Sequence, residues 1–420
     1  MHLSDHFVDP GSYGGYQIQN VSGTILSMLT GERPTAVLPR EALGGLYKEY
    51  DKVVLFLVDG FGWSQFTNMA LQRPFIKSLL DTGVLLKLAT QFPSTTACNV
   101  TTVNTGLTVA RHGLFEWFYY EPEADDIIAP LLFSYAREQK VRDSLRKNAG
   151  VKPAEIYPSE SIYQKMAGHG VKCYAFQNRE YARSTFSDII FSPAIVQGYE
   201  SASDGLAALA KAVLSEPEKA YFYFYYDGID SALHHHGPGS KEVRAAFSKF
   251  LECLEKVFRE TLLSAGIDKV GNTAFILTAD HGQTSIDPAK TIYLNQDFPE
   301  IERYLRRNRD GKILAPAGSC RDMFLYVKAE YLPATLAFLN ERLYGRAIVC
   351  KTSDLVSAGY FGSSDISEAL RGRLGDLVIL PLQGESVWWY EKDVFEVTFK
   401  GHHGGLTRDE MEIPFLMWSL

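Results

Sequence analysis

The chain has 420 residues, enough for two or three domains of typical size or for one large enzyme domain with an insertion. With 46% hydrophobic and 22% charged residues, its composition is that of an ordinary globular protein, which excludes a disordered, collagen-like or coiled-coil chain. The formal net charge of −8 argues against a nucleic-acid polymer as the main partner, because phosphate contacts need a local excess of basic residues.

The sequence also indicates in which cellular compartment the protein is expected. No apolar run approaches the ~18 residues that a membrane span requires, and the first residues lack the charged and apolar regions of a signal peptide. The cysteines are odd in number and widely spread, which favours free thiols in a reducing compartment over a disulfide framework. We therefore expect a cytoplasmic protein without a membrane span. The oligomeric state is not indicated.

Short apolar runs alternate with helical patterns along the first two thirds of the chain. Residues 53–58 form a continuous apolar run that stops at Asp59, as expected of a strand buried on both faces. Residues 221–226 and 274–277 repeat this pattern and run into Asp227, Asp230 and Asp280. Between them, apolar residues recur every three or four positions over 240–264, which predicts a long helix. This order favours a parallel sheet whose ligands bind at the C-terminal ends of the strands.

The pattern changes over residues 286–374, with shorter strand-like runs such as 323–327, one helical pattern over 331–343 and more turns. Strand patterns return at 376–380 and 414–418. The predicted fold is therefore α/β, with a mostly parallel central sheet sandwiched by helices. We expect this core to comprise residues 1–285 and 375–420, and residues 286–374 to form a small α+β insertion.

Six of the ten histidines fall in three short clusters, His234–His235–His236, His281 and His402–His403. Each cluster lies in a turn-like stretch that contains glycine, and the first two lie near an aspartate. Histidine and carboxylate are ligands that suit zinc or manganese. Asp59 also needs a partner, because an unpaired buried carboxylate is costly. The clusters therefore predict a metal site that folding assembles.

Three adjacent hydroxyl side chains, Ser94, Thr95 and Thr96, precede a helical pattern. The start of a helix offers unpaired N–H groups that stabilise a phosphate, and a threonine hydroxyl bound there to a divalent metal would be a nucleophile. Taken alone, the run predicts helix capping more readily than catalysis.

Five motifs occur in a characteristic order. They are Asp59 at the end of a strand; Phe92-Pro93-x-x-Thr96, followed by Thr105-Gly106-Leu107 and His112-Gly113; Asp230-x-x-x-His234, followed by Gly237-Pro238; Asp280-His281-Gly282; and His403-Gly404. This set resembles the alkaline phosphatase superfamily and, within it, the type I phosphodiesterase/nucleotide pyrophosphatase family. The resemblance spans about four fifths of the chain, and together the motifs are highly specific.

The resemblance implies a two-metal site. Thr96 would be the nucleophile and form a covalent phospho-threonine, and the amides around Thr96 and Ala97 would support the non-bridging oxygens. The two divalent ions, most simply Zn²⁺ with Mn²⁺ as the alternative, would lie on the order of 4 Å apart. The implied ligands are Asp230, His234 and His403 for one ion, and Asp59, Asp280, His281 and the Thr96 oxygen for the other.

Two positions depart from the family's pattern and concern substrate binding. Ala97 stands where nucleotide pyrophosphatases usually have an aromatic residue that stacks on the base, and Trp117 stands where the family has an asparagine that holds a phosphate oxygen. We expect Ala97 and Trp117 to lie at the substrate, with Trp117 part of an aromatic wall. Nucleotide specificity does not carry over to this chain.

The resulting function hypothesis is a hydrolase that cleaves phosphodiester or pyrophosphate bonds in a phosphorylated small molecule. A phosphomonoesterase or phosphonate hydrolase of the same superfamily is the alternative. A non-catalytic metal-binding protein is a third reading, and it is disfavoured because every ligand position and the nucleophile position are filled.

Overall fold

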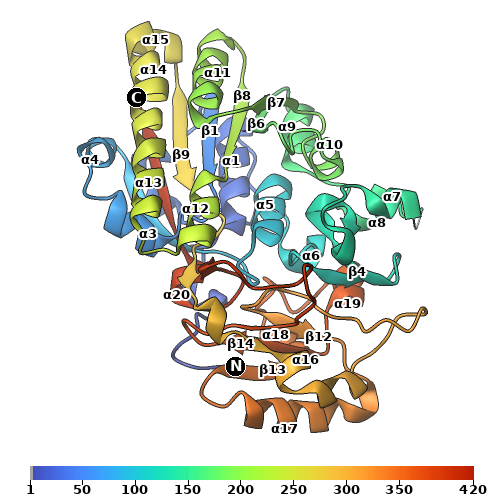
Figure 1. The fold of residues 1–420 in the computed structure, drawn as a ribbon. Helices are drawn as coiled ribbons and strands as arrows, with labels where there is room; N and C mark the ends of the chain where they lie inside the picture. Colours follow the sequence, from blue (N-terminus) through green and yellow to red (C-terminus); the bar gives the residue numbers. More distant parts are fainter. Residues whose placement is uncertain (1–2, 149) are drawn as a thin grey trace.

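The central feature of the computed structural model, which describes residues 3–148 and 150–420, is a seven-stranded sheet (Figure 1). Residues 1, 2 and 149 of the expected core lie outside the described residues. The strand order is β2-β17-β9-β1-β8-β6-β7, and β17 alone runs antiparallel to its neighbours. The strands are β1 (Lys52–Val58), β2 (Val84–Ala89), β6 (Lys172–Asn178), β7 (Ile195–Tyr199), β8 (Ala220–Tyr226), β9 (Thr273–Thr278) and β17 (Glu412–Ser419).

The three strands predicted from apolar runs are β1, β8 and β9, and they lie side by side at the centre of the sheet. All residues of β1 and β9 are buried, as expected of strands covered on both faces. The prediction of a mostly parallel sheet between helices is confirmed.

Helices cover both faces of the sheet. In β8, Phe224 and Tyr226 point to one face, where Tyr226 stacks on Phe250 of α13 (Lys241–Cys253). Tyr221 points to the other face and packs on Tyr163 of α9 (Ile162–Gly168). The first face carries α11 (Ala202–Ser215), α13 (Lys241–Cys253) and α14 (Glu260–Ala265); the second carries α1 (Gln19–Thr30), α5 (Thr96–Thr105) and α9 (Ile162–Gly168). The helix predicted over 240–264 is confirmed as α13 and α14, joined by a π-helical segment over Leu254–Arg259.

A smaller α+β region lies below the central sheet in Figure 1. It contains an antiparallel sheet of β12 (Met323–Leu325), β14 (Leu377–Pro381) and β13 (Ala347–Lys351), with α17 (Leu332–Arg342) and α18 (Thr352–Ser357). Strand β11 (Ile292–Tyr293) pairs with β15 (Val387–Trp388) in the same part of the chain.

The sequence places residues from 375 onward in the core, but the strand pairing joins the first of them to the smaller region. The strand pattern at 376–380 is β14, which pairs with β12 and β13 and makes no ladder with the central sheet. The apolar run identified a buried strand but not its partners, because both sheets bury such a strand equally well. We propose that the smaller unit extends past residue 374 to the segment that contains β15.

No helix in the described residues is both long and apolar enough to cross a membrane.

Candidate metal and phosphoryl-transfer site

The ends of three adjacent central strands bring the predicted acids together. Asp59 follows β1 directly, and Asp280 follows β9 by two residues. Asp230 follows β8 and lies in the first turn of α12 (Gly228–His236). Because β8, β1 and β9 are parallel neighbours, their C-terminal ends meet at one edge of the sheet.

Asp230 and His234 lie one turn apart on α12, and their Oδ2 and Nε2 atoms are 3.3 Å apart. This spacing puts both side chains on one face of the helix. The expectation that the His234–His236 cluster lies in a turn-like stretch is therefore wrong: the cluster forms the last turn of α12, which ends at Gly237 with φ 80°. Glycine next to the histidines marked the end of a helix rather than a loop.

Ser94 holds the late histidine motif beside the threonine motif. The Ser94 hydroxyl donates to the carbonyl of Gly405 (2.7 Å) and accepts from the N–H of Gly404 (3.1 Å). The Ser94 carbonyl in turn accepts from Nδ1 of His403 (3.0 Å). These contacts join residues more than 300 positions apart in the sequence, so His403 reaches the end of the sheet.

Thr96 is the first residue of α5, and its Oγ1 lies 3.0 Å from Nε2 of His281. The two hydroxyls before it have other partners: Ser94 bonds the Gly404–Gly405 segment, and Thr95 donates to the carbonyl of Phe115 (3.0 Å) while capping α5 at Cys98. Of the three adjacent hydroxyls, that of Thr96 faces the acids and histidines.

All three predicted histidine ligands present the same nitrogen to the centre. Nδ1 of His234 lies 2.8 Å from the Gly401 carbonyl, Nδ1 of His281 lies 3.1 Å from that of Gly282, and His403 is held by Ser94. A carbonyl accepts only from a protonated nitrogen, so Nδ1 carries a proton in each ring and Nε2 is the nitrogen that faces the centre and can bind a metal.

Burial keeps two of these rings neutral. It lowers the pKa of His281 to about 4 and that of His403 to about 3. The two rings stack with their centroids 3.6 Å apart. Two protonated rings could not stack so closely in a buried site, so the arrangement suits metal-binding imidazoles.

The carboxylates show that the donor set fits divalent cations. Oδ1 of Asp59 and Oδ2 of Asp280 are buried without a hydrogen-bond partner. Burial, with the nearby Asp230 and Asp280, raises the pKa of Asp59 well above its usual range, and burial raises that of Asp280 to about 7. Unpaired buried oxygens and crowded acids are costly unless a cation binds them.

Ligand atoms of two residue groups each lie within 4.8 Å of one another. One group is Asp230, His234 and His403; the other is Asp59, Asp230 and His281. Asp230 therefore belongs to both groups. The structure brings all seven predicted metal-ligating residues, including Thr96 and Asp280, to one centre, with mixed nitrogen and oxygen donors of the kind that zinc binds.

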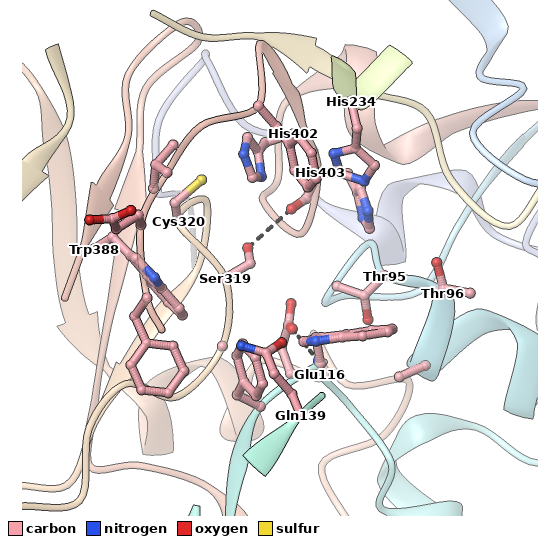
Figure 2. Close-up of a pocket in the computed structure, with 18 of the residues that line it drawn as sticks. Thr95, Thr96, Glu116, Gln139, His234, Ser319, Cys320, Trp388, His402 and His403 are labelled. Carbon is pink, nitrogen blue, oxygen red and sulfur yellow. Dashed lines mark hydrogen bonds between the residues drawn. The ribbon is translucent and has the colours of Figure 1, made fainter. Parts of the chain in front are cut away.

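A pocket with a volume of about 420 Å³ opens beside this centre (Figure 2). Thr96, Ala97 and Trp117 are among the residues that line it, together with Asp230 and three histidines, two of which are predicted metal ligands. Trp117 belongs to an aromatic wall in which its ring contacts Phe118, and Phe118 contacts Trp388 and Phe395. The structure thus places both predicted substrate-binding residues at the pocket.

A buried carboxyl pair that sequence reasoning missed consists of Glu116, which lines the pocket, and Asp322. Both side chains are fully buried and lie within hydrogen-bonding reach of each other, and Oε1 of Glu116 and Oδ2 of Asp322 have no other partner. Oγ of Ser319 lies 2.6 Å from Oδ1 of Asp322 and 3.0 Å from the His403 carbonyl oxygen, so its single hydrogen can be donated to either acceptor. Burial raises the pKa of Glu116 to about 8 and that of Asp322 well above its usual range.

This pair predicts a pH-dependent stability. Glu116 has an ordinary pKa near 4.5 when unfolded and about 8 when folded, so its stabilising contribution is fully present below pH ~4.5 and is lost as the pH rises through 8. We expect Glu116→Gln to gain stability relative to the natural chain between pH 5.5 and 8, measured as a growing difference in melting temperature. Exposed Glu123→Gln is the control; equal pH slopes for both variants would contradict the assignment.

Two further residues at the centre were missed, Tyr225 and Gln283. The Tyr225 hydroxyl donates to Oδ2 of Asp59, and Nε2 of Gln283 donates to Oδ1 of Asp230. Tyr225 lies in a strand of alternating aromatic residues, a pattern typical of core. Gln283 could have been found from its position immediately after the Asp280-His281-Gly282 motif.

Comparison with known proteins gives a family and a fold. A family model described as type I phosphodiesterase/nucleotide pyrophosphatase matches residues 53–406. Ectonucleotide pyrophosphatase/phosphodiesterase family member 1 of Mus musculus is 26% identical over 256 residues, which cover 60% of this chain and 26% of the relative; the Rattus norvegicus protein is 26% identical over 267 residues. The chain thus spans about a quarter of the length of these curated relatives.

Among solved structures, murine ectonucleotide pyrophosphatase/phosphodiesterase 5 is similar with a TM-score of 0.61 and 17% identity, covering 87% of this chain and 88% of that one. Phosphonoacetate hydrolase from Sinorhizobium meliloti 1021, in complex with phosphonoformate, is similar with a TM-score of 0.60 and 16% identity, covering 87% and 89%. At these identities the likeness shows the fold, and it agrees with the α/β architecture described above. Because the family model covers most of the sequence, the chain belongs to the type I phosphodiesterase/nucleotide pyrophosphatase family.

Proposed function

We propose that the protein is a metal-dependent hydrolase that cleaves phosphodiester or pyrophosphate bonds in a phosphorylated small molecule through Thr96. One observation carries the proposal. Oγ1 of Thr96 lies 3.0 Å from Nε2 of His281 at the start of α5, facing the two groups of acids and histidines. A hydroxyl, a helix N-terminus and two candidate metal sites in one place suit phosphoryl transfer.

Each residue of the centre has its own role in the proposed reaction. The Thr96 oxygen attacks phosphorus, the bond to the leaving group breaks, and a phospho-threonine forms, which water then hydrolyses. The N–H groups of Thr96 and Ala97 precede the first intrahelical bond, from Asn99 to the Thr95 carbonyl, so they are available to phosphoryl oxygens. Asp59, Asp280 and His281 would hold one zinc ion with Thr96, and Asp230, His234 and His403 the other. When bound, zinc ions lower the pKa of the threonine hydroxyl and offset the phosphoryl charge.

The similar structures support this reading without fixing the substrate. One solved form of the murine protein is an inactive threonine-to-alanine variant in complex with AMP, and another solved relative is a phosphonoacetate hydrolase. A phosphonate or phosphomonoester hydrolase is therefore the second candidate.

The pocket lining argues against a substrate whose leaving group carries a carboxylate. The residues that line the pocket include Glu116 and Glu396 beside the aromatic wall, and no lysine or arginine is among them. A carboxylate group placed against this wall, as in phosphonoacetate, would lack a cationic partner and would face acidic side chains. An uncharged leaving group has no such cost.

Metal removal and a substrate comparison test the proposal. Exhaustive chelation is expected to lower the turnover of bis-p-nitrophenyl phosphate at least ~100-fold, because both charge stabilisation and nucleophile activation are lost. Added Zn²⁺ or Mn²⁺ should restore it. The zinc-loaded protein should turn over this diester faster than p-nitrophenyl phosphate or phosphonoacetate. An unchanged rate after chelation would contradict the metal mechanism, and a preference for the monoester or the phosphonate would favour the second candidate.

We also propose that the protein is cytoplasmic. All five cysteines are free thiols, which suits a reducing compartment. Cell fractionation tests this location, and recovery of the protein from the extracellular fraction would contradict it.

A further inference from the structure

The three acids at the centre share one arrangement: the protein holds one oxygen of each carboxylate. Oδ2 of Asp59 accepts from the Tyr225 hydroxyl, and its Oδ1 has no hydrogen-bond partner. Asp280 accepts backbone N–H groups of Gly60 (3.2 Å) and His281 (3.0 Å) on Oδ1, and its Oδ2 has no partner. Each of these two carboxylates therefore has one oxygen fixed by a donor and one left for a ligand.

Asp230 repeats the arrangement with a different donor. Its Oδ1 accepts from Nε2 of Gln283, and its Oδ2 faces Nε2 of His234 at 3.3 Å. Gln283 is fully buried, and its backbone carbonyl accepts from Nε2 of Gln65 (3.0 Å). This contact fixes the backbone of Gln283, and burial confines its side-chain amide against Asp230.

Tyr225 is suited to hold Asp59 because its hydroxyl is buried at the end of β8 and donates directly to the carboxylate. The neighbouring residues Tyr199 and Tyr181 fix the segment: the Tyr199 hydroxyl donates to the Tyr225 carbonyl (2.6 Å), and the Tyr181 and Tyr225 rings pack edge to face. The hydroxyl is therefore a donor of fixed position.

We propose that Tyr225 and Gln283 are positioning residues that orient Asp59 and Asp230, each for a different metal ion; this inference rests on the proposed function of the centre. Donors behind a metal ligand fix its orientation, and their loss typically weakens metal binding 10–100-fold. Asp280 is held by the backbone alone, so Tyr225 and Gln283 are the side-chain supports of the three acids. Asp59 belongs to one candidate metal group and Asp230 to both. The implied ligand sets assign Asp230 to the ion held with His234 and His403, so we expect the two supports to act chiefly on different ions.

Two matched pairs of variants test the proposal. Tyr225→Phe removes the donor, and Tyr221→Phe removes a hydroxyl from the same strand and the same face that is buried without a partner. Gln283→Met removes the second donor, and Gln177→Met removes a buried amide bonded to the Ser187 hydroxyl (3.0 Å) in β6, outside the centre.

The measurement is a titration of the metal-free, full-length chain with Zn²⁺ against a chromogenic chelator. We expect Tyr225→Phe and Gln283→Met each to lower the affinity for one of the two zinc ions about 10–100-fold. The affinity for the other ion should stay within about twofold of that of the natural chain. The two variants should affect different ions, so their double variant weakens both. The controls should bind zinc as the natural chain does.

Several outcomes would overturn the inference. Zinc affinities of Tyr225→Phe equal to those of Tyr221→Phe would do so, and so would equal weakening of both ions by either variant, which marks a general structural defect. Melting temperatures of the metal-free variants identify a variant that fails to fold. If Tyr225→Phe fails to fold, the comparison of Gln283→Met with Gln177→Met decides the outcome. If the natural chain binds two zinc ions yet hydrolyses no phosphoester, the proposed function fails while the positioning roles remain measurable.

Discussion

Thr96→Ala is expected to lower the turnover of a phosphodiester by about 10³-fold or more, because neither of the two neighbouring hydroxyls offers an oxygen at the same point. The positions of the three adjacent hydroxyls single out Thr96. Thr96 Oγ1 faces His281 at 3.0 Å, while the oxygens of Ser94 and Thr95 are bonded to Gly405 and Phe115. Zinc should still bind, since the acids and histidines remain. Steady-state kinetics and metal analysis of the same preparation check both statements.

Thr95→Ala is the matched control for this experiment. It removes the hydroxyl that caps α5 at Cys98, which typically lowers stability by about 0.5–2 kcal/mol, and it leaves the proposed nucleophile in place. We expect a lower melting temperature with turnover reduced far less than in Thr96→Ala. Retained activity in Thr96→Ala together with its loss in Thr95→Ala would move the nucleophile to Thr95.

The centre of the fold could be predicted from the sequence because its signals are local. The runs that became β1 and β8 are continuous and apolar, and the positions that became α13 repeat at helical spacing. Edge strands such as β7, in which exposed residues predominate, carry no such signal. The pairing of β14 with β12 was also beyond prediction, since partner choice depends on contacts between segments far apart in the chain.

Some residues of the candidate site could likewise be predicted from the sequence, and others could not. Asp59, Asp280 and His403 could be named because acids after buried strands and clustered histidines are unusual. Tyr225 could not, because one hydroxyl in an aromatic strand is indistinguishable from its neighbours until the fold aims it at Asp59. Glu116 was overlooked for a related reason: it is followed by an aromatic run, and only the structure places it opposite Asp322.

A buried ion pair fixes the smaller α+β region against the central sheet near the metal centre. Arg321, which precedes β12, donates to both carboxylate oxygens of Glu410 at 2.9 and 3.0 Å, and both side chains are fully buried. Glu410 also accepts from the N–H of Gly405 (3.1 Å). The pair therefore touches the segment that carries His403.

Glu410→Gln is expected to lower the free energy of unfolding by about 3–5 kcal/mol, because it leaves the Arg321 guanidinium buried without its counter-charge. Chemical denaturation of the metal-free protein measures this loss. Asp365→Asn is the control, since its pair with Arg111 (3.4 Å) is exposed on both sides and such pairs contribute only ~0–1 kcal/mol. The same substitution of Glu410 should also weaken zinc binding at His403, because the Gly404–Gly405 segment loses its anchor. A loss as small as that of Asp365→Asn would show that the guanidinium reaches water or another acceptor when Glu410 is neutral.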